Sequence, residues 1–127
     1  MRVLITMITF AITGYSMLSG AQAACTGSNG RGWGTGNGAG QFEMTAADKT
    51  CRMSFQGVIN EAAKTRIPAT QVTITRAPAS GKIAVTKSGL IYTPNKGFQG
   101  SDTFCTNNTT PKVPGITLSG CVTVTVR

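Results

Sequence analysis

The sequence predicts an all-β fold, a β-sandwich of about seven short strands. Short segments in which apolar and polar side chains alternate are separated by clusters of glycine, proline, asparagine and serine, as in antiparallel sheets. The chain contains four cysteines, an even number that is typical of two disulfide bonds in a small exported domain. Its 127 residues suit one domain.

The first 23 residues have the pattern of a cleaved signal peptide. A short basic start precedes a largely apolar run from Val3 to Leu18, and small residues follow up to Ala23. A retained membrane anchor fits less well because the run is short and contains threonines. A lipoprotein anchored at Cys25 fits less well because Gln22 stands where that signal needs leucine. We expect cleavage after Ala23 and a secreted or periplasmic protein.

Glycine dominates residues 24–40. A phosphate-binding loop is one interpretation, but neither G-x-G-x-x-G nor G-K-[ST] is present and no helix pattern follows. We therefore expect a flexible lead segment that Cys25 tethers to the domain. Trp33 is the one large ring in this segment, and the sequence leaves open whether it packs on the domain or faces a ligand.

Residues 41–127 are expected to form the sandwich domain. Seven segments have the alternation and the β-branched or aromatic content of strands. They are residues 41–45, 51–56, 70–76, 82–86, 89–93, 102–106 and 121–127. Between them, the stretch from Val58 to Arg66 fits either a short helix or a long connection. Residues 106–120 are polar, are broken by Pro111 and Pro114, and are expected to form an exposed loop.

The alternation of side chains favours one disulfide pairing among the three that four cysteines allow. Val122, Val124 and Val126 are expected to face the core, so Cys121 faces outward, and Cys105 faces outward because Phe104 faces inward. If the two strands are antiparallel neighbours, the sulfurs of Cys105 and Cys121 lie at bridging distance. The remaining pair is then Cys25–Cys51.

The most specific stretch of the sequence, residues 90–104, predicts a strand, a sharp corner and the start of a second strand. Pro94 ends the first strand because it has no N–H to donate. Gly97 tolerates the positive φ of a turn. We expect Phe98 to fold back beneath the corner and the carboxylate of Asp102 to accept hydrogen bonds from nearby backbone N–H groups.

This corner resembles a signature of known domains. The spacing of its residues is that of the Y-x-P-x-x-G-F-x-G-x-D-x-F pattern of bacterial Ig-like (cadherin-like) domains of extracellular proteins. The matching residues are Tyr92, Pro94, Gly97, Phe98, Gly100, Asp102 and Phe104. The resemblance covers roughly residues 70–127 and implies an Ig-like sandwich. Only one copy is present and the acidic calcium-binding clusters of cadherins are absent, so the resemblance does not extend to tandem arrays or calcium binding.

The composition excludes several kinds of chemistry. The chain has no histidine, which excludes a Ser-His-Asp or Cys-His arrangement and the usual zinc sites. A catalytic carboxylate pair would need two of the four acidic residues, Glu43, Asp48, Glu61 and Asp102, to converge. The net charge is +8, but the basic residues are scattered and form no nucleic-acid patch. We expect no enzyme, no cofactor, no metal, no nucleic-acid partner and no membrane insertion after cleavage.

Two functions remain. The first is a structural or adhesive module that binds a protein or a glycan at the cell envelope. The second is a small secreted inhibitor or effector that inserts the loop 106–120 into a partner, with Val113 and Ile116 as apolar anchors.

Overall fold

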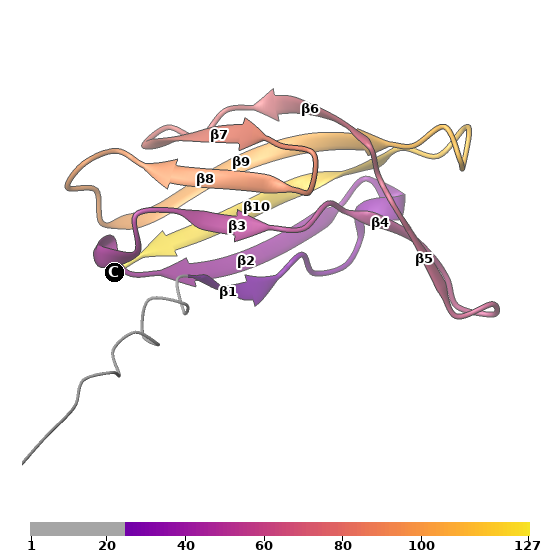
Figure 1. The fold of residues 1–127 in the computed structure, drawn as a ribbon, viewed down its shortest axis with the longest axis horizontal. Helices are drawn as coiled ribbons and strands as arrows, with labels where there is room; N and C mark the ends of the chain where they lie inside the picture. The colour runs from indigo at the N-terminus through magenta and orange to yellow at the C-terminus, as the bar shows by residue number, and fades with distance from the viewer. Residues whose placement is uncertain (1–24) are drawn as a thin grey trace, which may run out of the picture.

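The computed structural model describes residues 25–127, and the predicted signal peptide, residues 1–23, lies outside them. Strands and turns make up nearly all of this part of the chain, with two short 3-10 helices (Figure 1). The elements are β1 (Cys25–Ser28), η1 (Trp33–Thr35), β2 (Gly38–Met44), η2 (Ala46–Asp48), β3 (Cys51–Met53), β4 (Gly57–Asn60), β5 (Thr65–Pro68), β6 (Gln71–Arg76), β7 (Gly81–Val85), β8 (Leu90–Pro94), β9 (Gly100–Thr109) and β10 (Leu118–Val126). The prediction of an all-β fold is confirmed.

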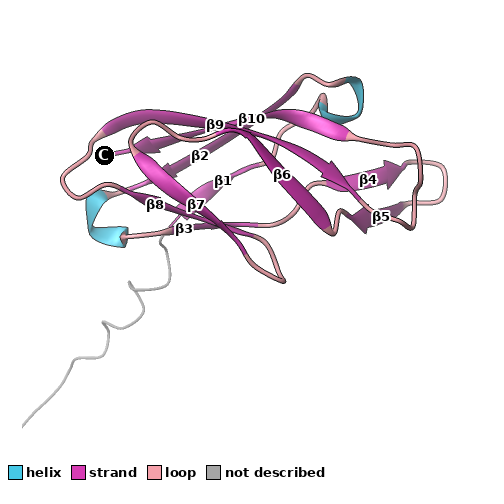
Figure 2. Cartoon of the chain, turned by 90° about the horizontal axis from the view of Figure 1, so that it is seen from above, coloured by secondary structure: helices cyan, strands magenta, loops and turns pink. Residues whose placement is uncertain are grey.

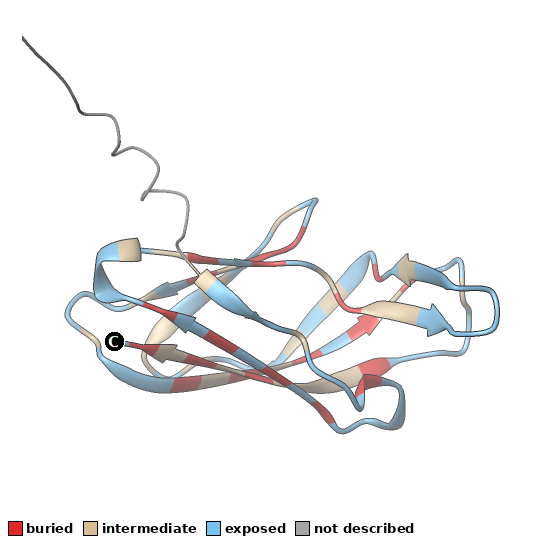
Figure 3. Ribbon diagram, turned by 90° about the horizontal axis from the view of Figure 1, so that it is seen from below, coloured by how far each residue is buried: buried red, intermediate tan, exposed pale blue. Residues whose placement is uncertain are grey.

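Two sheets enclose the hydrophobic core. A five-stranded sheet has the order β1-β2-β10-β9-β6, and a three-stranded sheet has the order β3-β8-β7. β2 runs parallel to β10, whereas the other neighbours are antiparallel. Along the strands buried residues alternate with exposed ones (Figure 3), because successive side chains point to opposite faces of a sheet. The core contains Phe42, Met44, Cys51, Met53, Leu90, Tyr92, Phe104, Val122, Val124 and Val126.

The prediction of an exposed loop over residues 106–120 is wrong in its extent. β9 continues to Thr109 and β10 begins at Leu118, so only residues 110–117 connect them. The sequence did not reveal this because the extra residues of β9 are polar, and two of them, Thr106 and Asn108, are nevertheless buried. The buried amide of Asn108 donates to Leu118 O at 3.0 Å and to Thr106 Oγ1 at 2.9 Å, which compensates for the removal of its N–H groups from water.

The stretch from Val58 to Arg66 is a β-hairpin, not a helix or an unstructured connection. β4 pairs with β5 around a turn at residues 61–64 and forms a separate two-stranded sheet. The sequence carries a signal for it, because β-branched residues on both sides of a polar turn are typical of a hairpin. Figure 2 shows this hairpin at one end of the molecule, beyond the other strands.

The glycine-rich segment 24–40 also differs from the expected flexible lead. β1 pairs with β2, and β2 pairs with the last strand of the chain. Gly38 lies opposite Gly120 in that pairing, and a Cβ on Gly120 would be 2.3 Å from the Cα of Gly38. Several of these glycines are therefore needed for close packing of backbone against backbone, which is one of the uses of glycine inside strands.

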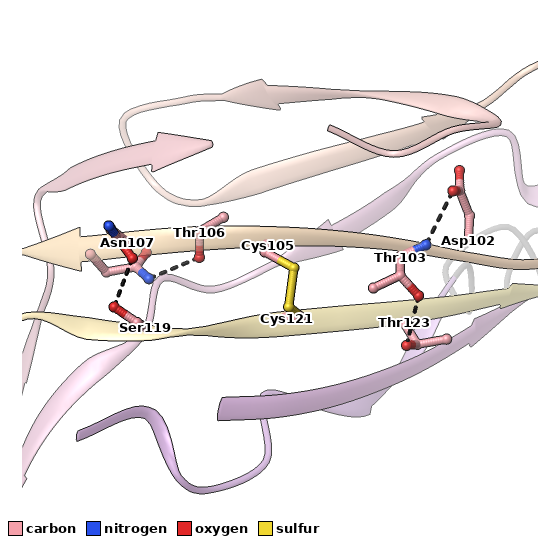
Figure 4. The surroundings of a disulfide bond; sticks show 9 residues. Asp102, Thr103, Cys105, Thr106, Asn107, Ser119, Cys121 and Thr123 are labelled. Atoms are coloured by element: carbon pink, nitrogen blue, oxygen red, sulfur yellow. Dashed lines mark hydrogen bonds between the residues drawn. A yellow bond between two sulfur atoms is a disulfide. The ribbon is translucent and has the colours of Figure 1, made fainter. Parts of the chain in front are cut away.

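The two disulfide bonds join the pairs that the alternation predicts. Cys105 lies directly opposite Cys121 on the outer face of β9 and β10, with the Cα atoms 3.9 Å apart. Figure 4 shows this bridge between two polar cross-strand pairs, Thr103 with Thr123 and Asn107 with Ser119. Cys25 bonds Cys51 and thereby links β1 of the larger sheet to β3 of the smaller one.

We predict that Gly120→Ala destabilises the protein by about 3 kcal/mol, because the new methyl group collides with the backbone of Gly38 and the parallel pair must separate. A lower denaturant midpoint with an unchanged slope would report this loss. Gly34→Ala is the matched control, since no atom lies within 4 Å of the position that its Cβ would take, and its stability should change by less than about 0.5 kcal/mol. Equal effects of the two substitutions would contradict the steric explanation.

Candidate functional site

A groove of about 920 Å³ lies at the end of the molecule where the β4–β5 hairpin projects. Its walls come from the loop after β1, from the hairpin, and from the start of β10 with the loop before it. Both ends of the described chain lie elsewhere: Cys25 pairs with Met44, and Arg127 N donates to Met44 O at 2.9 Å. Figure 1 shows the C-terminus at the opposite end from the hairpin.

The first wall is the glycine-rich loop, and Trp33 fixes its shape. The indole ring is 6% exposed and covers Gly38, where even a Cβ would lie 2.1 Å from the ring. Its Nε1 donates to Asn29 O at 2.6 Å. Trp33 therefore packs on the domain, which resolves the question that the sequence left open. The side chain of Asn29 donates to Ser54 O at 3.2 Å and so connects this loop to the segment after β3.

The second wall is the β4–β5 hairpin. The Arg66 side chain crosses β4 above Gly57, where any Cβ would collide with it, and its guanidinium donates to the carbonyl oxygen of Phe55. Ile59, opposite Arg66 in the hairpin, is 63% exposed. An isoleucine with that exposure beside a groove is an available apolar contact.

The third wall contains one of the two apolar anchors that the sequence singled out. Ile116 is 41% exposed and lines the groove together with Leu118. Val113 is half-buried and is not among the lining residues. Sequence analysis missed the other contributors, Ile59, Arg31 and Arg66, because their neighbours in the groove come from distant segments of the chain.

The groove is basic as well as apolar. Arg31 and Arg66 line it with a single acidic residue, Glu61. Neither arginine makes a salt bridge within residues 25–127, whereas Arg127 pairs with Glu43 at 3.3 Å at the other end of the molecule. The guanidinium of Arg31 is exposed and free to bind a carboxylate.

The corner at residues 90–104 has the geometry that the sequence suggests. The buried carboxylate of Asp102 accepts from Ala79 N at 2.9 Å, from Ser80 N at 3.0 Å and from the hydroxyl of Tyr92 at 2.7 Å. It thereby joins β8, β9 and the turn before β7. The remaining corner residues support this: Pro94 is the last residue of β8, Gly97 and Gly100 have positive φ, Phe98 packs against the core, and Phe104 is buried.

Burial and the hydrogen bond to Asp102 raise the pKa of Tyr92. The phenol must stay protonated to donate to the carboxylate, and an ionised phenolate beside Asp102 would repel it. The raised pKa of Tyr92 therefore reflects the interactions that stabilise the corner. Tyr92 lies in the core and outside the groove.

The acidic residues do not converge. Asp48 accepts from Thr45 N at 2.7 Å and caps η2, Glu43 pairs with Arg127, Glu61 lines the groove, and Asp102 holds the corner. Among residues 25–127 there is no cluster of three or more metal-ligating side chains. No helix in this same part of the chain is long and apolar enough to cross a membrane.

Comparison with known proteins found no relative of this chain. No model of a protein family matches the chain, no curated protein matches it, and no solved structure matches it.

We predict that Asp102→Ala destabilises the protein by about 3 kcal/mol, because it leaves the buried Tyr92 hydroxyl and two part-buried backbone N–H groups without their acceptor. Equilibrium denaturation measures the loss. Asp48→Ala removes a carboxylate that caps an exposed turn and should cost about 1 kcal/mol. A smaller effect at position 102 than at position 48 would contradict the assigned role.

We also predict that stability falls as the pH rises above about 10, the pKa of an unperturbed tyrosine. The pKa of Tyr92 is higher in the folded state, so the folded protein keeps a proton that the unfolded chain releases, and alkaline pH favours unfolding. The slope attributable to this group is about 1.4 kcal/mol per pH unit. Denaturation series at neutral and alkaline pH, compared with Tyr92→Phe, measure it. The idea fails if the variant loses stability as steeply as the parent.

Proposed function

We propose that the chain is an exported, non-catalytic Ig-like module that binds a protein of the cell envelope through the groove beside the β4–β5 hairpin. The observation that carries this proposal is the pair of exposed isoleucines, Ile59 and Ile116, that face one basic groove from separate parts of the chain. Large exposed apolar side chains that gather in a concave surface are typical of binding sites.

The strand order supports the Ig-like part of the proposal. In Ig domains strands B, E and D share one sheet and strands C, F and G share the other. Six strands correspond in chain order to B, C, D, E, F and G; they are β3, β6, β7, β8, β9 and β10. With this assignment the sheet order β3-β8-β7 is B-E-D and the sheet order β6-β9-β10 is C-F-G. β2 then takes the place of a first strand that has joined strand G, and the β4–β5 hairpin is an insertion between B and C.

Export is supported by the sequence before Ala24 together with the chemistry of the cysteines. Two disulfide bonds, with no free cysteine among the described residues, suit an oxidising compartment. The predicted cleavage after Ala23 leaves all four cysteines in the mature protein. Secretion into the medium and retention in a periplasm both fit this pattern.

A protein partner is better supported than a glycan. Sugar rings commonly stack on exposed aromatic side chains, and the aromatic residues described here are buried or half-buried. The exposed contacts of the groove are aliphatic and cationic. The alternative of an inhibitory loop has less support, because β9 and β10 extend into residues 106–120 and shorten the loop to residues 110–117, and because Val113 does not line the groove.

Retention on envelope fractions tests the proposal. Protein harvested after export should begin at Ala24 and should be retained by envelope protein from its own organism. We predict that Ile116→Asp lowers the affinity about tenfold, because it places a carboxylate at an apolar contact that the bound partner would bury. Val85→Asp is the matched control, since Val85 is 49% exposed and lies on β7, away from the groove.

Several results would contradict this function. No retention at low salt would remove the binding role, and retention that survives protease treatment of the envelope would indicate a glycan or lipid partner. Equal effects of Ile116→Asp and Val85→Asp would move the binding surface away from the groove.

A further inference from the structure

We infer that the groove takes an extended acidic segment of the partner protein as a third strand on the free edge of β4. This inference rests on the proposed binding function and specifies its mode. It has three supports: the position of β4 beside the groove, the direction of its unpaired backbone groups, and the charge of the opposite wall.

β4 has a strand partner on one side only. It pairs with β5, and no other strand of residues 25–127 pairs with it. The consecutive residues Gln56, Gly57, Val58 and Ile59 all line the groove. Since successive side chains of a strand point to opposite faces, a groove that touches each of these residues runs along the edge of the strand.

The register of the hairpin directs backbone groups into that groove. Ala69 N donates to Gln56 O at 2.8 Å, so Gln56 and Ala69 form a hydrogen-bonded pair. Hydrogen-bonded and non-hydrogen-bonded pairs alternate in an antiparallel ladder. Gly57–Pro68 and Ile59–Arg66 are therefore non-hydrogen-bonded pairs, and Pro68, which has no N–H, suits such a position. The N–H and C=O groups of Gly57 and Ile59 then point away from β5.

Arg66 crosses β4 above Gly57, but the residues of β4 themselves lack the features that protect edges from pairing. A charged residue, a proline or a bulge on an edge strand discourages the addition of another strand. The edge strand β6 has a register shift between Ile74 and Arg76, and the edge strand β7 carries Lys82. β4 has the sequence Gly-Val-Ile-Asn, with none of these. Strand addition is a common mode of peptide recognition at an open sheet edge.

Charge identifies the occupant as acidic. Arg31 stands on the glycine-rich wall and Arg66 on the hairpin, and the charge-assisted hydrogen bonds of guanidinium with carboxylate are strong. The net charge of the chain is +8, so a second copy would be repelled from the groove. Aliphatic side chains that alternate with the acids would meet Ile59 and Ile116.

Selection from a displayed library of random peptides, about eight residues long, tests the inference. Immobilisation of the exported protein through a C-terminal tag leaves the groove exposed, because the C-terminus lies at the opposite end. We expect the enriched peptides to alternate acidic with aliphatic residues and to lack proline at their centre. On binding, the backbone amides of Gly57 and Ile59 should become protected from hydrogen exchange.

Two substitutions at one position separate backbone pairing from side-chain contact. Ile59→Pro removes an outward N–H without removing a hydrogen bond to β5, and we expect it to weaken binding of the selected peptides about tenfold. Ile59→Thr keeps the N–H and should weaken binding only about twofold to threefold. Arg31→Glu should also weaken binding about tenfold, whereas Lys82→Glu, an equal change of charge on β7, should leave it unchanged.

Each other result overturns the inference. Absence of enrichment, enrichment of basic or aromatic peptides, or equal losses with Ile59→Thr and Ile59→Pro would exclude strand addition by an acidic segment. Self-association of the protein at the same edge would identify a second copy as the occupant. If envelope protein is retained but Ile59→Pro and Arg31→Glu bind it normally, the binding function stands and this mode is wrong.

Discussion

The close approach of Gly38 to Gly120 is the contact on which the end of the molecule that contains the groove depends. It brings the beginning of β2 against the beginning of β10 in a parallel pair, with room for no side chain between them. Trp33 then covers Gly38, and the hydrogen bond from its Nε1 to Asn29 O holds the preceding loop in place. Without this contact the first wall of the groove would be a glycine-rich segment with high conformational entropy.

The opposite half of the molecule is held by a polar interaction in the core. Asp102 gathers two backbone N–H groups and the Tyr92 hydroxyl around one buried carboxylate. A buried carboxylate is costly unless hydrogen bonds compensate for it, and here the donors come from the turn before β7 and from β8. The two disulfide bonds add covalent links, one within the larger sheet and one between the sheets.

Sequence reasoning predicted the features that depend on local alternation. The inward valines of β10 predicted the direction of Cys121, and Pro94 with the glycines of residues 90–104 predicted the corner. It failed where the cause lies in a distant segment. A glycine does not reveal which backbone approaches it, so Gly38 was assigned to a flexible segment and Gly120 to an exposed loop. Asn108 looked like a loop residue because the sequence does not show that Leu118 supplies an acceptor for its amide.

Two walls of the groove are attached to adjacent carbonyl groups of the segment after β3. Asn29 on the glycine-rich wall donates to Ser54 O, and Arg66 on the hairpin donates to Phe55 O. Both walls are thus attached to neighbouring points of one short segment, while Arg66 also holds the beginning of β4 from above. A groove with fixed walls loses little conformational entropy when a ligand binds, which favours recognition of an extended chain. Arg66 thus contributes both to the position of the hairpin wall and to the positive charge of the groove.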